Sequence, residues 1–275
     1  MTNFVRKIIN KFLGVRNLQL VSKSRLAHLD GNEKQLRLIS KIQDIKCDPI
    51  IRDDITKLFL DHKSYSQIGQ DLFAVFFNSN NSNLFQKWFV EFGATDGISL
   101  SNTYQLENVF SWNGILAEPG VTWHEHLLKN RKCPIDSRAV WHSTGILLSF
   151  QESQIREFSS LSQFIDKTKT ISQKKVEYLV ETISLNDLLD FHSSPANVGY
   201  LSVDTEGSEY EIMKNLNFVK YKFGFINVEH NYGESREKIF QLLSHNGYSR
   251  IMPEFSEWDD FYIPSDHPLR KFFYQ

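Results

Sequence analysis

The chain of 275 residues carries a formal net charge of −2, with 31 lysines and arginines against 33 aspartates and glutamates. This balance excludes the strongly basic composition of a dedicated nucleic-acid-binding protein, so we expect no nucleic-acid partner. Two cysteines are too few for a disulfide framework or a zinc cluster, and no apolar run reaches the roughly 20 residues of a membrane-spanning helix, which together favour a cytoplasmic protein.

Residues 1–62 are predicted to form an N-terminal helical extension, followed by one larger domain at residues 63–275. Residues 1–28 contain six basic residues and no acidic one, and their apolar side chains recur at helical spacing between positions 4 and 13. We expect this first helix to pack on its own domain or on the second subunit of a homodimer. The alternative is a peripheral contact with the inner membrane surface or with a partner protein.

The sequence W-F-V-E-F-G-A-T-D-G at residues 88–97 is the central feature of the larger domain. Its first half is aromatic and β-branched, as in a strand buried on both faces, with Glu91 near the carboxyl end. The glycines that follow predict a tight turn. A helix comes next, for which Asn102 and Gln105 resemble a capping pair. Strand, glycine turn and helix form the first unit of a nucleotide-binding α/β fold.

The spacing of the glycines distinguishes between cofactors. Gly93 and Gly97 are four residues apart, and Thr95 stands where a dinucleotide fingerprint has its second glycine, the one that admits the pyrophosphate. The pattern therefore favours S-adenosylmethionine, which carries no phosphate. Glu118 also favours a nucleoside ligand. It ends the second predicted strand 25 residues beyond Gly93, near the spacing at which an acid accepts hydrogen bonds from ribose hydroxyls.

Strand-like runs continue along the chain and predict an α/β fold with a doubly wound, mostly parallel seven-stranded sheet and an antiparallel edge. The predicted strands are residues 88–92, 114–118, 137–142, 199–203, 223–228, 248–252 and 260–263, with 146–150 as a hairpin neighbour of 137–142. The predicted helices are residues 33–45, 49–61, 67–77, 102–110, 122–128, 184–191 and 235–246. Residues 151–176 are rich in Ser, Gln, Lys and Thr, and we expect an insertion that covers the substrate as a lid.

Acidic residues gather at the ends of the fourth and fifth predicted strands. Asp204, Glu206 and Glu209 follow the fourth strand within six residues. Glu229 ends the fifth strand and precedes His230. If such carboxylates converge, their mutual repulsion raises the pKa of at least one of them, which is a frequent property of functional sites.

Several segments occur in series between residues 64 and 264, namely S-Q-I-G-Q-D, V-E-F-G-A-T-D-G, L-S-N-T-Y-Q-L-E, G-I-L-A-E-P, K-N-R-K-C, L-S-V-D-T-E-G-S-E and N-V-E-H. In order and spacing they resemble the FkbM-type S-adenosylmethionine-dependent methyltransferases. The resemblance implies the Rossmann-like class I methyltransferase fold, with the cofactor lying across the carboxyl ends of the strands. It also implies acceptor hydroxyls on sugars or on polyketide-type products.

The same resemblance implies which residues bind the cofactor. They are Gln67, Gln70, Glu91, Gly93, Ala94, Asp96, Gly97, Asn102, Glu118, Ala139, Val140 and Asp204. Asn102, with Gln67 and Gln70, is expected to bind the amino-acid end of the cofactor. Glu118 is expected to hold the ribose hydroxyls, and Ala139 and Val140 to flank the adenine. Asp204 is expected beside the sulfonium, where its negative charge is favourable.

Methyl transfer to a hydroxyl needs alignment of the acceptor and a base for its proton. The candidate catalytic bases are His230, Asp204 and Glu206, and an ordinary histidine pKa leaves His230 mostly neutral at pH 7. Alternatively, Asp204, Glu206 and Glu229 bind Mg²⁺, which would acidify the hydroxyl. Their spacing matches no diagnostic metal motif, so we expect no metal.

The sequence as a whole favours an O-methyltransferase that acts on a hydroxyl of a saccharide, a glycan or another small molecule. Two alternatives remain open. One is a non-catalytic module of the same fold that binds the cofactor or a partner. The other is a nicotinamide-dependent oxidoreductase, which Thr95 in place of the middle glycine disfavours.

Overall fold

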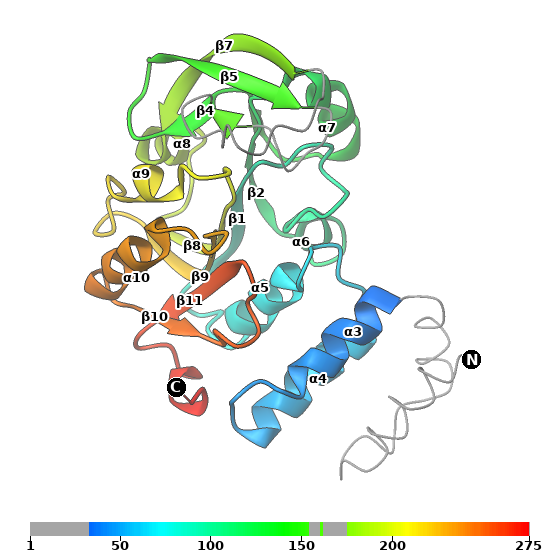
Figure 1. Cartoon of the computed structure of the whole chain (residues 1–275). Helices are drawn as coiled ribbons and strands as arrows, with labels where there is room; N and C mark the ends of the chain where they lie inside the picture. The colour runs from blue at the N-terminus through cyan, green and yellow to red at the C-terminus, as the bar shows by residue number, and fades with distance from the viewer. Residues whose placement is uncertain (1–32, 154–159, 162–174, 275) are drawn as a thin grey trace.

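Seven strands form the central sheet, in the order β10-β11-β9-β8-β1-β2-β3 (Figure 1). This computed structural model describes residues 33–153, 160–161 and 175–274. The strands are β1 (Gln86–Phe92), β2 (Asn113–Ala117), β3 (Ile135–Asp136), β8 (Asn197–Val203), β9 (Lys222–Glu229), β10 (Tyr248–Ile251) and β11 (Asp259–Pro264). All pairings from β9 to β3 are parallel, whereas β11 pairs antiparallel with β9 and β10. The predicted doubly wound sheet with an antiparallel edge is confirmed.

Two predicted features lie outside the described residues. These are the basic helix within residues 1–28 and most of the insertion at residues 151–176. The predictions that the first contacts a membrane or a partner, and that the second forms a lid, therefore stay predictions.

Helices cover both faces of the sheet. They are α3 (Glu33–Ile42), α4 (Pro49–Asp61), α5 (Gln70–Ser79), α6 (Tyr104–Asn108), α7 (His124–Asn130), α8 (Leu185–Phe191), α9 (Glu209–Met213) and α10 (Ser235–His245), with 3-10 turns at Val121–Trp123 and Arg270–Phe272. Strands β8 and β9 are buried along almost their whole length, as expected for parallel strands covered on both sides. No helix in the described ranges is long and apolar enough to cross a membrane.

The two helices α3 and α4 contribute buried side chains to the core of the larger domain. Phe59 of α4 packs on Phe73 of α5 with ring centroids 5.1 Å apart, and Phe77 stacks on Phe225 of β9 at 5.3 Å. The buried Gln35 of α3 donates to the carbonyl of Phe59 at 2.6 Å. Aromatic packing thus joins residues 33–61 through α5 to one face of the sheet.

A second sheet of four strands lies at one end of the molecule, beside α7 and α8 in Figure 1. It has the order β4-β7-β5-β6, with β4 (Ala139–Trp141), β5 (Leu147–Ser153), β6 (Ser160–Leu161) and β7 (Lys175–Ser184). This corrects two predictions. The third strand of the central sheet is the two-residue β3, not residues 137–142. The hairpin partner of β5 is the unpredicted β7, which pairs with it antiparallel over seven positions.

The predicted capping pair Asn102 and Gln105 is also wrong. Helix α6 begins at Tyr104 after Thr103, and the hydroxyl of Ser101 accepts hydrogen bonds from the N–H groups of these two residues at 3.1 and 3.2 Å. The amide of Asn102 donates instead to the hydroxyl of Ser202 on β8, 2.9 Å away. A tertiary contact in the buried interior has replaced the local one, and it turns Asn102 toward the ends of the parallel strands.

Candidate functional site

A cavity of about 510 Å³ opens at the carboxyl ends of β1, β2, β8 and β9. In a parallel sheet with helices on both faces, this edge is where ligands bind. Most of the residues predicted for the site line the cavity: Gln67, Glu91, Gly93, Ala94, Asn102, Glu118, Ala139, Val140, Asp204, Glu206 and Glu229. Four predicted residues are not among the lining residues: Gln70, Asp96, Gly97 and His230.

The turn after β1 brings two strand ends into contact. Gly93 has a φ of +70°, and a Cβ placed on it would lie 2.6 Å from the carbonyl oxygen of Asp204. No side chain fits there, because that separation is far below van der Waals contact. The absence of a side chain lets the ends of β1 and β8 form one continuous wall of the cavity.

Glu118 holds this turn in place from the end of β2. One carboxylate oxygen accepts a hydrogen bond from the backbone N–H of Thr95 at 2.8 Å, and the other from Gly120 at 2.7 Å. Thr95 has a φ of +46°, a conformation that costs energy for a β-branched residue and needs such support. Glu118 is buried yet lines the cavity, so a single carboxylate shapes the turn and forms part of the cavity wall.

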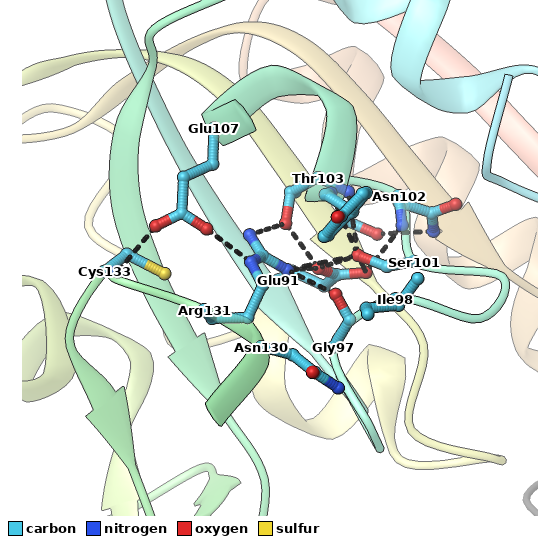
Figure 2. Close-up of polar contacts among 12 residues, drawn as sticks. Glu91, Gly97, Ile98, Ser101, Asn102, Thr103, Glu107, Asn130, Arg131 and Cys133 are labelled. Atoms are coloured by element: carbon cyan, nitrogen blue, oxygen red, sulfur yellow. Dashed lines mark hydrogen bonds and ion pairs between the residues drawn. The ribbon is translucent and has the colours of Figure 1, made fainter. Parts of the chain in front are cut away.

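Behind the turn lies a buried ionic network, shown in Figure 2. Glu91 of β1 accepts hydrogen bonds from the backbone N–H of Asn102 at 2.7 Å and from the hydroxyls of Ser101 and Thr103 at 3.0 and 2.5 Å. The guanidinium of Arg131 lies 3.7 Å from the same carboxylate. Glu91 therefore fixes the backbone of the segment that covers the cavity.

Arg131 completes the network from the end of α7, and its side chain is 0% exposed. It donates to the carbonyl of Gly97 at 3.2 Å, to the Thr103 hydroxyl at 2.9 Å and to Glu107 at 2.5 Å. The planar guanidinium group of arginine carries five N–H donors in fixed directions and can bind several separate acceptors at once. The single ammonium group of a lysine could not reach all of them. Arg131 thereby joins the glycine turn, the following segment and α6.

Sequence reasoning did not assign Arg131 or Glu107 to the site. Arg131 belongs to the K-N-R-K-C segment, which we used only for its family resemblance. A basic residue just after a short helix normally indicates solvent exposure. Its burial depends on two acids that are distant in sequence, and no local pattern reveals them.

Asn102 lines the cavity and has an unsatisfied acceptor. Its amide nitrogen binds Ser202, whereas its side-chain oxygen is buried without a hydrogen-bond partner. A buried polar atom of this kind costs about 1–3 kcal/mol unless a ligand satisfies it. Gln67 also lines the cavity, and its oxygen accepts from the indole N–H of Trp258 at 3.2 Å.

Three of the predicted cofactor residues support the site from outside the cavity. Gln70 is buried, where it donates to Asp259 at 2.9 Å and accepts from the N–H of Ile68 at 2.9 Å, so both ends of its amide are occupied. Asp96 accepts from the N–H groups of Ile98 and Ser99 in a local turn. Gly97 packs against the side chains of Leu127 and Arg131.

The adenine end of the predicted site is apolar. Ala139 and Val140 of β4 line the cavity together with Phe150 of β5, and all three are buried. Pairing of β4 with β7 in the second sheet holds these residues over the central sheet. A flat heteroaromatic ring suits such a surface.

Three carboxylates converge at the ends of β8 and β9, which lie on the other side of β1 from β2 and Glu118. One oxygen each from Asp204, Glu206 and Glu229 lies within 4.8 Å of the others. Burial, followed by the charges of Asp204 and Glu206, raises the pKa of Glu229 well above its usual range. Glu209 does not join this group. It accepts from the N–H groups of Thr205 and Gly207, and burial raises its pKa.

His230 is not placed to act as the base that we predicted. Its side chain is 1% exposed. One ring nitrogen contacts the carbonyl of Asp259 at 2.9 Å, and the other accepts from the N–H of Tyr232 at 2.9 Å. Burial lowers the pKa of His230, and the ring stays neutral with both nitrogens occupied. The carboxylates, not the histidine, face the cavity.

Comparison with known proteins identifies the methyltransferase FkbM domain, whose family profile matches residues 91–261, more than half of the chain. The matched region begins at Glu91 and includes the glycine turn, Glu118 and the three converging carboxylates. No curated protein sequence matches the chain. The domain match confirms the resemblance seen in the sequence and supports a methyltransferase over an oxidoreductase.

Replacing Arg131 with methionine is expected to lower the free energy of unfolding by about 3–5 kcal/mol, because Glu91 and Glu107 would keep buried charges without their partner. Urea unfolding measures this loss. Lys129→Met, an exposed change on the same helix, serves as the control. Equal free energies of unfolding for the two variants would contradict a stabilising role for the ionic network of Arg131 with Glu91 and Glu107.

Proposed function

The chain belongs to the FkbM methyltransferase family, and on that premise we propose that it transfers a methyl group from S-adenosylmethionine to a hydroxyl group of a saccharide. The observation that supports this proposal best is that two kinds of surface line one cavity. Ala139, Val140 and Glu118, which follows β2, form the end assigned to the cofactor, and the converging carboxylates across β1, at β8 and β9, form the end assigned to the acceptor.

The residues present fit S-adenosylmethionine. Ala139 and Val140 offer an apolar surface for the adenine, Glu118 offers a carboxylate for the ribose, and the unsatisfied oxygen of Asn102 suits an ammonium group. The cofactor supplies an activated methyl group on a sulfonium when bound. Asp204 follows β8 on the wall next to Gly93, where its charge favours a cation.

The acceptor end has the features that a sugar requires. Trp258 and Asn231 line the cavity beside Glu206, and the backbone N–H of Asn231 donates to the carbonyl of Trp258 at 3.1 Å. An indole ring offers an apolar face for the C–H groups of a pyranose, while amide and carboxylate groups bind its hydroxyls. Tyr232, exposed next to Asn231, extends the aromatic surface outward.

The carboxylates carry the proton transfer in this proposal. A sugar hydroxyl held at this end would donate its proton to Asp204 or Glu206 as its oxygen bonds to the methyl carbon, while the bond from that carbon to sulfur breaks and S-adenosylhomocysteine leaves. Asp204 and Glu206 are partly exposed to the cavity, whereas Glu229 is buried, so the role of base falls to its two neighbours. His230 donates to backbone and fixes the loop that follows β9.

Glu118→Ala is expected to weaken binding of S-adenosylhomocysteine by about 1–3 kcal/mol, because the ribose hydroxyls and the N–H of Thr95 would lose their acceptor. Isothermal titration calorimetry gives the dissociation constants. Glu125→Gln, an exposed change in α7, is the matched control. An unchanged dissociation constant for Glu118→Ala would remove the assignment of Glu118 to the ribose.

The acceptor class is tested by incubating the chain with S-adenosylmethionine and a panel of mono- and oligosaccharides, with amines and thiols as competing acceptors. We expect S-adenosylhomocysteine to form only with saccharides, and mass spectrometry to place the methyl group on oxygen. Glu206→Gln should lower kcat by about 10²-fold or more without changing cofactor affinity. Exposed Glu234→Gln should match the wild type. Methylation confined to amines or thiols would refute the hydroxyl acceptor.

A further inference from the structure

We propose that Asp204, Glu206 and Glu229 bind a divalent cation of the magnesium or manganese type at the acceptor end of the cavity. Asp204 and Glu206 lie in the loop after β8, and Glu229 is the last residue of the neighbouring strand β9. One oxygen of each lies within 4.8 Å of the others, and all three residues line the cavity. Three oxygens at this separation can reach one ion.

A second observation points to a ligand at this position. Glu229 is only 8% exposed, and its Oε2 is buried without a hydrogen-bond partner. Buried polar atoms in proteins are nearly always satisfied, and an unpaired carboxylate oxygen beside two further carboxylates is the least favourable case. A cation supplies both the missing partner and the opposite charge.

The donor set indicates which cation would bind. All three donors are carboxylate oxygens, which magnesium, manganese and calcium prefer. The nearest imidazole, that of His230, has both nitrogens in contact with backbone groups and offers no ligand. Cys47 and Cys133 lie outside the cavity lining. The site therefore lacks the nitrogen and sulfur ligands typical of zinc.

Such an ion has a role in the reaction if the proposed function is correct, and this part of the inference rests on it. A divalent cation of this type takes six or more oxygen ligands, so three carboxylates would leave positions for water or for a sugar hydroxyl. A hydroxyl bound to a divalent cation loses its proton more easily, and Asp204 or Glu206 accepts that proton. The ion would also fix the orientation of the acceptor.

Metal binding is measured on the full chain after treatment with a chelator and dialysis. Manganese is titrated and its free fraction followed by electron paramagnetic resonance, with calorimetric titration of magnesium alongside. We expect one saturable site. Glu229→Gln and Glu206→Gln should each weaken manganese binding at least about tenfold, since ligand charge sets the affinity of such sites. Glu211→Gln, an acid of α9 paired with Lys214, should bind as the wild type does.

Binding of S-adenosylhomocysteine is measured on the same samples and reports on folding and on the cofactor site independently of the metal. No saturable manganese site in wild-type protein that binds S-adenosylhomocysteine would overturn the metal proposal and leave the proposed function intact. The same holds if wild type and both site variants bind manganese equally. A manganese site without any transfer to saccharides would instead refute the proposed acceptor alone.

Discussion

The buried contact between Glu91 and Arg131 is the interaction on which the site depends. Ionised groups are tolerated in a protein interior only when they are paired and hydrogen-bonded. Glu91 and Arg131 meet this condition, because each also forms hydrogen bonds with nearby backbone and hydroxyl groups. The consequence is geometric. Glu91 and Arg131 both bind the segment from Gly97 to Thr103 (Figure 2). The backbone of Asn102 is therefore fixed, and its side chain reaches Ser202 and the cavity wall from a fixed position.

The close approach of Gly93 to Asp204 links the two ends of the cavity. On one side of this contact, Thr95 binds Glu118 and forms the part of the cavity that suits a nucleoside. On the other side, Asp204 meets Glu206 and Glu229. A methyl donor and an acceptor have to meet at such a junction, because transfer requires the reacting atoms in contact and in line. The packing of strand ends thus sets the place of the chemistry.

Much of the fold and part of the candidate site could be predicted from local sequence. The other features of the site depend on contacts between segments that are distant in the sequence. The glycine turn and the position of Glu118 follow from spacing along two consecutive strands, so the sequence predicts them directly. The charge of Arg131 and the amide of Gln70 look solvent-exposed in sequence but are buried by remote partners. His230 was misassigned for the same reason. Strand β7 carries the β-branched and aromatic residues typical of a strand in V-E-Y-L-V-E, yet its partner β5 is not adjacent to it in the sequence.

The most direct test of the account is calorimetric titration of the chain with S-adenosylhomocysteine and, separately, with NAD. We predict saturable micromolar binding of S-adenosylhomocysteine and no binding of NAD, because Thr95 occupies the position where a pyrophosphate needs glycine. Folded protein that binds NAD with similar affinity, or that fails to bind S-adenosylhomocysteine, would contradict the assignment of this cavity to the methyl donor.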